Sequence, residues 1–170
     1  MSFAPIPLYH DPYGKDPSSA GQGRLFHQLH HVGNFLRGVR LQLRYGELSR
    51  APLRLLRFQV VDEIVECDWM ARSPDPWDVD LARRVQQRHA SLQALRDAID
   101  VRAFLFDVLP QVETANVCVF RESAEYTPEM IISGSVHRND HSSRNLHSIV
   151  MRARILGFRF RMEDEVLFRI

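Results

Sequence analysis

PWDVDLARRVQQRHASLQALRDAIDVRAFLFDVLP, residues 76–110, carries the strongest structural signal in this chain. Its apolar residues recur at intervals typical of a helix: Leu81, Val85, Leu92, Leu95, Ile99, Phe106 and Leu109. Asp75 can cap this helix, Pro76 suits its first turn, and Pro110 ends it. Unbroken, the helix would be about 50 Å long, whereas a compact domain of this size is roughly 30 Å across. We therefore expect either a break near Asp100 or a helix that projects and finds a partner.

The stretch before this helix is predicted to form two β-strands. Leu53–Val61 and Ile64–Ala71 are both rich in β-branched and aromatic residues. For the second stretch, the spacing of Ile64 and Val65 with the preceding valine also suits a helical face, so both interpretations stay open. Trp69 and Trp77 flank the proline-containing loop that follows, and we expect both to anchor it against the core.

The N-terminal third predicts an arm, a helix and a strand. Residues 1–23 contain four prolines and three glycines, which is typical of an extended arm. From residue 24 the apolar positions fit one helical face, and Gly38 can end that helix: Leu25, Leu29, Val32 and Leu36. Val39–Tyr45 alternates apolar residues with polar ones, two of them arginines, which indicates a strand.

The C-terminal third predicts two strands, a helix and a β-hairpin: Val117–Phe120, Met130–Val136, 142–156, Phe158–Met162 and Val166–Ile170. Asp140 or a neighbouring serine can cap the helix, and Gly157 ends it. We therefore expect an α+β fold, with one antiparallel or mixed sheet and two to three helices packed mainly on one face. The extended arm, residues 1–23, would precede a single domain, residues 24–170.

Composition restricts the class of protein. The chain has 170 residues, of which 45% are hydrophobic and 25% charged, and this is typical of a globular domain with its own core. A net charge of +1 gives little overall attraction to nucleic acid or acidic membranes. No apolar run is long enough to predict a membrane helix, and no signal peptide is recognisable. Cys67 and Cys118 fit no disulfide or zinc spacing, so we expect inert thiols in a cytoplasmic protein.

Two histidine pairs are the best candidates for a metal site. His27 and His31 are four residues apart, and so are His137 and His141. Neutral imidazoles bind zinc and similar divalent metals, and Asp140 can orient such a set. Without the glutamate of the His-Glu-x-x-His motif, ordinary solvated histidines explain the same spacing. No other cofactor is expected.

The Arg-rich segment 24–57 is the first candidate for anion or nucleic-acid binding. It contains seven arginines and a single acidic residue, with Arg37, Arg40 and Arg44 close together. The aromatic residues Phe26, Phe35 and Tyr45 are interleaved in the same segment. Arginine contacts to phosphate combined with aromatic stacking are typical of nucleic-acid binding surfaces. Residues 62–80 contain seven acids and one arginine, so neutralisation between adjacent strands is the alternative explanation.

A second anion-binding candidate lies at the start of the predicted C-terminal helix. Arg138, Ser142 and Arg144 surround this start, where free backbone N–H groups favour an anion. Serines in this position also serve as ordinary helix caps. The sequence therefore leaves both a phosphate site and a purely structural role open.

The leading functional hypothesis is a non-catalytic binding or assembly module that works as a homo-oligomer. It depends on the N-terminal arm, which would reach a neighbouring subunit, on the long apolar run of residues 77–109, and on the lack of a strong catalytic motif. The first rival is a metal-dependent hydrolase that uses the paired histidines. The second is a nucleic-acid or phosphate-binding protein that uses the Arg-rich segment. A second copy of the chain, or another protein, is the expected partner, and no membrane partner is expected.

Overall fold

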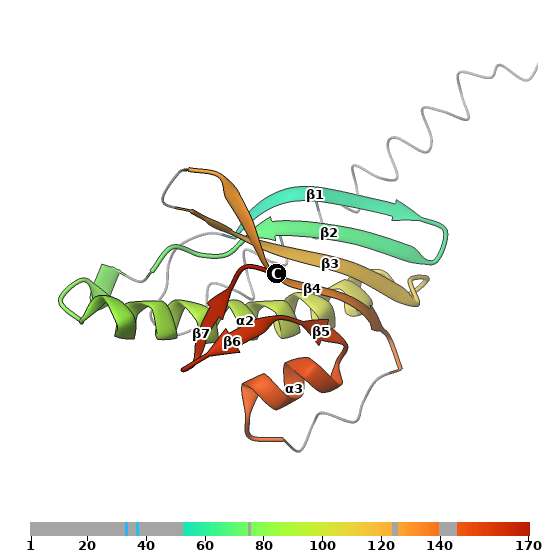
Figure 1. Ribbon diagram of the computed structural model, residues 1–170. Helices are drawn as coiled ribbons and strands as arrows, with labels where there is room; N and C mark the ends of the chain where they lie inside the picture. The colour runs from blue at the N-terminus through green and yellow to red at the C-terminus, as the bar shows by residue number, and fades with distance from the viewer. Residues whose placement is uncertain (1–32, 34–36, 38–52, 75, 124–125, 140–145) are drawn as a thin grey trace, which may run out of the picture.

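The computed structural model describes residues 33, 37, 53–74, 76–123, 126–139 and 146–170. Ten elements follow one another in this part of the chain (Figure 1): β1 (Arg54–Val61), β2 (Ile64–Met70), the 3-10 turn η2 (Pro76–Asp78), α2 (Arg83–Val108), β3 (Thr114–Glu122), β4 (Pro128–His137), α3 (Ile149–Ile155), β5 (Phe158–Arg159), β6 (Arg161–Glu163) and β7 (Val166–Phe168). The predicted α+β class is confirmed. Neither described helix is long and apolar enough to cross a membrane.

Five strands form one mixed sheet in the order β1-β2-β3-β4-β5. β2 and β3 are parallel, and the other neighbouring pairs are antiparallel. Parallel neighbours need a crossover connection, and α2 provides it between β2 and β3. β6 and β7 form a separate antiparallel hairpin. Of the two sheet types that the sequence left open, the mixed sheet is the one observed.

The two faces of the sheet differ in polarity. In β2, Val65, Cys67 and Trp69 are fully buried, while Glu66 and Asp68 between them are only half-buried. This period of two defines an inner apolar face and an outer polar face. β2 is therefore a strand, which removes the helical interpretation of this segment.

Helix α2 is continuous and packs inside the domain. Its 26 residues correspond to about 39 Å. In Figure 1 it runs along the sheet, with α3 and the β6–β7 hairpin beside it. Contact on more than one side explains why Leu95, Val101 and Phe104 are all buried, although they point in different directions around the helix. The prediction of a break near Asp100 or of a projecting helix is therefore wrong.

The helix is shorter than predicted because its N-terminus lies further along the chain. Pro76–Asp78 forms a 3-10 turn, and α2 begins at Arg83 with Ala82 as its N-cap. The prediction that Pro76 occupies the first turn of the long helix is wrong. The predicted N-cap, Asp75, lies outside the described residues.

Helix α3 also begins later than predicted. It starts at Ile149, where the Ser148 hydroxyl accepts a hydrogen bond from the Met151 backbone N–H at 3.4 Å. The cap is thus Ser148, and residues 140–145, which include the predicted caps, lie outside the described part. Gly157 ends the helix as predicted, with a φ of 93° that favours glycine.

The predicted strand Phe158–Met162 divides into two. β5 pairs with β4, whereas β6 pairs with β7 in the predicted hairpin. The hairpin turn has positive φ at Asp164 (48°) and Glu165 (64°), as a tight two-residue turn requires. Near the N-terminus, Gly33 and Arg37 are helical and exposed, in agreement with a helix there. The arm 1–23 and the strand predicted at 39–45 lie outside the described residues.

Candidate functional site

Arg138, a predicted anion contact, binds backbone carbonyls at the end of α2. Its Nε donates to the carbonyl of Val112 at 2.9 Å, its Nη1 to Phe106 at 2.7 Å, and its Nη2 to Leu109 at 2.6 Å. The last carbonyls of a helix have no partner within the helix, so the bond to Phe106 satisfies an acceptor that needs one. The bonds to Leu109 and Val112 fix the turn that follows α2. The structure therefore gives this guanidinium a structural role.

Arg102 makes the reciprocal connection from the helix to the end of β4. Its Nη2 donates to the carbonyls of His137 and, at 3.4 Å, of Arg138. Arg102 and Arg138 also lie over the Phe106 ring, 5.1 and 5.2 Å from its centre. We call Arg102, Phe106 and Arg138 the arginine clamp. Two cations beside the negative end of the α2 dipole are electrostatically favourable.

His137 is the one predicted metal ligand whose position is described. It is exposed at the end of β4, and its Nδ1 lies 3.2 Å from the Thr114 hydroxyl. His27, His31 and His141 lie outside the described residues. Within the described residues, no three or more His, Cys, Asp or Glu side chains are grouped closely enough to hold a metal ion. The four-histidine metal site stays a prediction.

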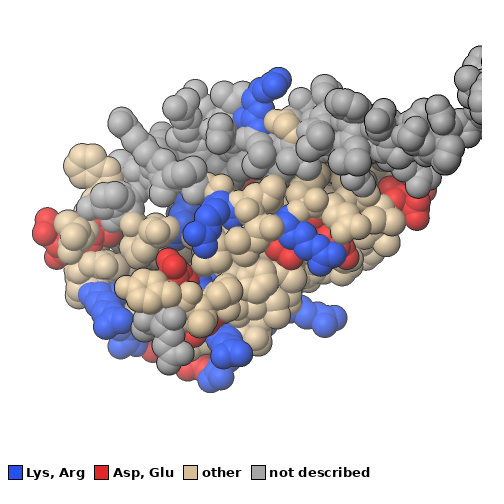
Figure 2. Space-filling model, turned by 90° about the horizontal axis from the view of Figure 1, so that it is seen from above, with Lys and Arg blue, Asp and Glu red and all other residues tan. Residues whose placement is uncertain are grey.

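The remaining predicted anion contacts are also largely outside the described residues. Arg37 is helical and exposed. The other predicted contacts lie outside the described residues: Arg40, Arg44, Ser142 and Arg144. Figure 2 shows basic and acidic side chains interspersed over the described surface seen from above. On this visible surface the charges are thus not separated into a basic patch. Nucleic-acid binding by the Arg-rich segment stays a prediction.

Residues 76–82, which we call the apolar loop, are fixed against the start of α2. The Leu81 backbone N–H donates to the Asp78 carbonyl at 2.9 Å. The Gln86 side-chain amide donates to the carbonyls of Leu81 at 2.9 Å and Val79 at 3.3 Å. His89 Nδ1 lies 2.9 Å from the Asp78 carboxylate. These contacts give the loop a defined shape on the helix surface.

The large side chains of this loop point outward. Trp77 is 77% exposed, Val79 71% and Leu81 41%. The expectation that both tryptophans anchor the loop against the core is therefore correct for Trp69, which is fully buried, and wrong for Trp77. Ala82 supplies no side-chain cap to α2. This end of the molecule presents apolar side chains next to an uncapped helix terminus.

A buried ion pair fixes the chain just before the apolar loop. Arg72 and Asp97 contact each other at 3.0 and 3.1 Å, and Gln93 donates to the same carboxylate at 2.9 Å. Burial raises the pKa of Asp97, and the charge of Arg72 opposes this effect. The pair connects the loop after β2 to the middle of α2. Sequence patterns gave no signal for it, because the two residues lie on different elements.

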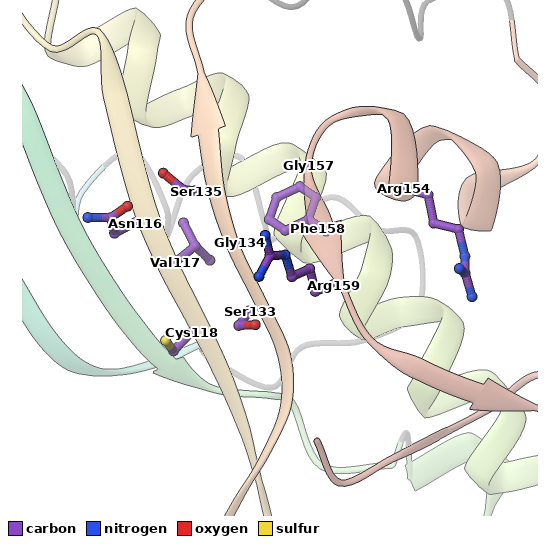
Figure 3. A pocket seen from close by; sticks show the side chains of 10 residues that line it. All are labelled: Asn116, Val117, Cys118, Ser133, Gly134, Ser135, Arg154, Gly157, Phe158 and Arg159. Carbon is purple, nitrogen blue, oxygen red and sulfur yellow. The ribbon is translucent and has the colours of Figure 1, made fainter.

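A pocket of about 530 Å³ lies on the outer face, where β3, β4 and β5 meet (Figure 3). Asn116 and Cys118 of β3 alternate with residues that face α2, so they point to the outer side. The strand register places Cys118 opposite Ser133 and Ser133 opposite Arg159, with Asn116 opposite Ser135. The pocket is therefore lined by two adjacent cross-strand rows of polar side chains.

Two glycines allow β5 to approach β4 closely beside this pocket. A Cβ on Gly134 would lie 3.0 Å from the Gly157 carbonyl oxygen and 3.1 Å from the Phe158 ring. A Cβ on Gly157 would lie 3.1 Å from the Ser135 carbonyl oxygen. Side chains at either position would push the strands apart, so these glycines set the position of Arg159.

Neither cysteine is an activated thiol. Burial raises the pKa of Cys67 well above its ordinary value, and the charge of Asp68 adds to this effect. Burial also raises the pKa of Cys118, again together with the charge and hydrogen bond of Asp68. A raised pKa lowers the thiolate fraction at neutral pH. The predicted inertness of Cys118 has this basis, although the side chain is only half-buried in the pocket.

Sequence reasoning missed the pocket, the arginine clamp and the exposed apolar loop. The pocket depends on the register of β4 with β5, and the exposure of the apolar loop depends on the true start of α2. The arginine clamp depends on the contact between the ends of α2 and β4. None of these features is encoded in a short motif. Comparison with protein-family models, curated proteins and solved structures found no match.

Proposed function

We propose that this protein is a non-catalytic binding or assembly module that self-associates through the apolar loop. The observation that carries the proposal is the outward orientation of Trp77, Val79 and Leu81 on a loop that hydrogen bonds hold in place. Clustered exposed apolar side chains often mark protein interfaces, and aromatic residues are enriched there. The long apolar run no longer supports the proposal, because α2 buries its apolar side chains within the domain.

The fixed shape of the loop favours binding. Ordering a flexible loop at an interface consumes part of the interaction energy, and a loop already ordered in the free protein avoids that cost. The contacts of Gln86 and His89 with the loop provide this order before any partner arrives. A large exposed indole on a fixed loop is also a common source of binding energy at interfaces.

A second copy of the chain is the partner that the charges favour. Asp80 in the loop and Arg83 at the start of α2 have no ion pair within the described residues. By contrast, Arg84 and Arg88 pair with Asp164 and Glu165 of the β6–β7 turn. In a two-fold dimer each copy can offer Asp80 to the other copy's Arg83, because an isologous interface uses the same patch twice.

Sedimentation velocity over a range of protein concentrations tests this proposal. The wild type should gain mass as concentration rises, and Val79→Asp should stay monomeric, because the interface would then bury an unpaired carboxylate. Met151→Asp is the matched control, since Met151 is a 51% exposed apolar residue on α3, outside the loop. A wild type that stays monomeric would overturn the proposal. An equal loss of association in both variants would remove the loop as its site.

The cytoplasm stays the proposed location. Cys67 and Cys118 are both unpaired. They lie on opposite faces of the sheet, so they cannot form a disulfide with each other. This arrangement suits a reducing compartment.

A further inference from the structure

The pocket on the outer sheet face has the composition of an anion site. Among the described residues that line it, two are arginines, three carry neutral polar side chains, and none is acidic: Arg154, Arg159, Asn116, Ser133 and Ser135. Hydroxyl and amide groups can donate hydrogen bonds to an oxyanion, and guanidinium groups add charge. The volume of about 530 Å³ lies within the range of about 300–1,000 Å³ for small-molecule sites.

Arg159 is the central cation of this site. It is exposed on β5 directly opposite Ser133, and its side chain has no hydrogen bond or ion pair in the part of the chain that the structure describes. In Figure 3 its side chain lies beside Gly134 and Ser133. The next arginine along the chain, Arg161, is by contrast paired with Glu163. The guanidinium of Arg159 is thus available to a ligand.

Arg154 has a secondary position. Its guanidinium lies over the Phe160 ring, 4.9 Å from the ring centre, and in Figure 3 it extends from α3 away from the other labelled side chains. It adds positive potential at the margin of the pocket. The direct contacts to a ligand would come from Arg159, Ser133 and Asn116.

We propose that this pocket binds a small molecule through a phosphate or carboxylate group, held by the guanidinium of Arg159 and the side chains of Ser133 and Asn116. The guanidinium can form two parallel hydrogen bonds to such an oxyanion, and the neutral donors add further contacts. The pocket is open to solvent, so an isolated anion should bind with millimolar affinity and more weakly as salt rises. This inference does not depend on self-association.

NMR titration of the full-length protein tests the proposal. Inorganic phosphate and, separately, succinate are added while the Nε–Hε resonances of the arginines and the amide resonances of Ser133 and Gly134 are followed. The Arg159 resonance should shift saturably with at least one anion. The anion with the higher affinity identifies the ligand group as phosphate or carboxylate.

Variants at the same site provide the control. Arg159→Gln should weaken binding at least about tenfold, since it removes the paired charge-assisted hydrogen bonds, and Arg159→Lys should retain part of the affinity. Arg169→Gln removes the same charge from an exposed position outside the pocket, and it should bind like the wild type. The proposal is overturned if neither anion shifts the Arg159 resonance, or if Arg159→Gln and Arg169→Gln bind equally well.

Discussion

The two ends of α2 are built differently. At the C-terminal end, Arg138 donates to three backbone carbonyls, and Arg102 donates hydrogen bonds to the end of β4. At the N-terminal end, Ala82 provides no side-chain cap, and the first turn contains Arg83 and Arg84 where acidic residues are favoured. Among the described residues, side chains therefore bond to the backbone at the C-terminal end of α2, whereas its N-cap residue offers no such bond.

The C-terminal end of α2 thus holds arginines with a structural role, whereas the N-terminal end leaves a surface exposed to a binding partner. The clamp uses a residue that resembled an anion contact in sequence, and its cations are occupied by carbonyls. At the uncapped end no side chain of the N-cap residue bonds to the helix backbone. The apolar loop beside this end leaves Trp77 and Val79 exposed. A helix terminus that is not optimised for stability is where a binding surface is expected, because function and stability often conflict.

The largest effect is expected at the C-terminal end. Arg138→Ala should lower the free energy of unfolding by about 2–3 kcal/mol, because the carbonyls of Phe106, Leu109 and Val112 lose a charged donor. Urea unfolding followed by circular dichroism measures this change. Arg138→Lys should recover part of it, since one ammonium cannot reach all three carbonyls.

Arg169→Ala is the control for the loss of one arginine. Arg169 is exposed, so its removal should change the free energy of unfolding by no more than about 0.5 kcal/mol. If Arg138→Ala were as mild as this control, the clamp would have no structural importance. Arg138 would then return as a candidate for anion binding.

A smaller effect of opposite sign is expected at the N-terminal end. Ala82→Asp should raise the free energy of unfolding by about 1 kcal/mol, because the new carboxylate can accept hydrogen bonds from the first-turn N–H groups. The backbone at Ala82, with φ −55° and ψ 138°, is already non-helical, as an N-cap residue requires. The same urea titration at low protein concentration measures the change.

Ala82→Asn separates the hydrogen bond from the charge. Both variants can cap the helix, and only the aspartate adds a favourable interaction with the helix dipole. An unchanged stability in both variants would show that the N-terminus is already satisfied, and the contrast between the two ends would disappear.

Local patterns predicted the elements but not their boundaries. The β-branched and aromatic residues of 64–71 predicted a strand, with a helix as the open alternative, and the strand is the one observed. The glycine at 157 ends its helix as predicted. The start of α2 was misplaced because Asp75 and Pro76 are good initiation signals, whereas the observed N-cap, Ala82, carries none. Packing on the sheet and the hairpin, and not capping, therefore sets where this helix lies.

The candidate sites were harder to predict than the fold. Arg138 was predicted as an anion contact, but the partners of its guanidinium are carbonyls on α2 and in the following turn. This role could not be read from its neighbours in sequence. Arg159 was not predicted as a binding residue, because its place in the pocket comes from the pairing of β5 with β4 at Ser133. Non-local register creates the pocket, and one sequence alone does not reveal that register.

The exposure of Trp77 provides the most direct test of the proposed assembly surface. The protein has two tryptophans, so 5-fluorotryptophan labelling gives two ¹⁹F resonances, with the fully buried Trp69 as an internal control. As protein concentration rises from about 10 µM to about 1 mM, a range in which micromolar association saturates, the Trp77 resonance should shift or broaden while the Trp69 resonance stays constant. A Trp77 resonance that does not change over this range would contradict self-association through the apolar loop.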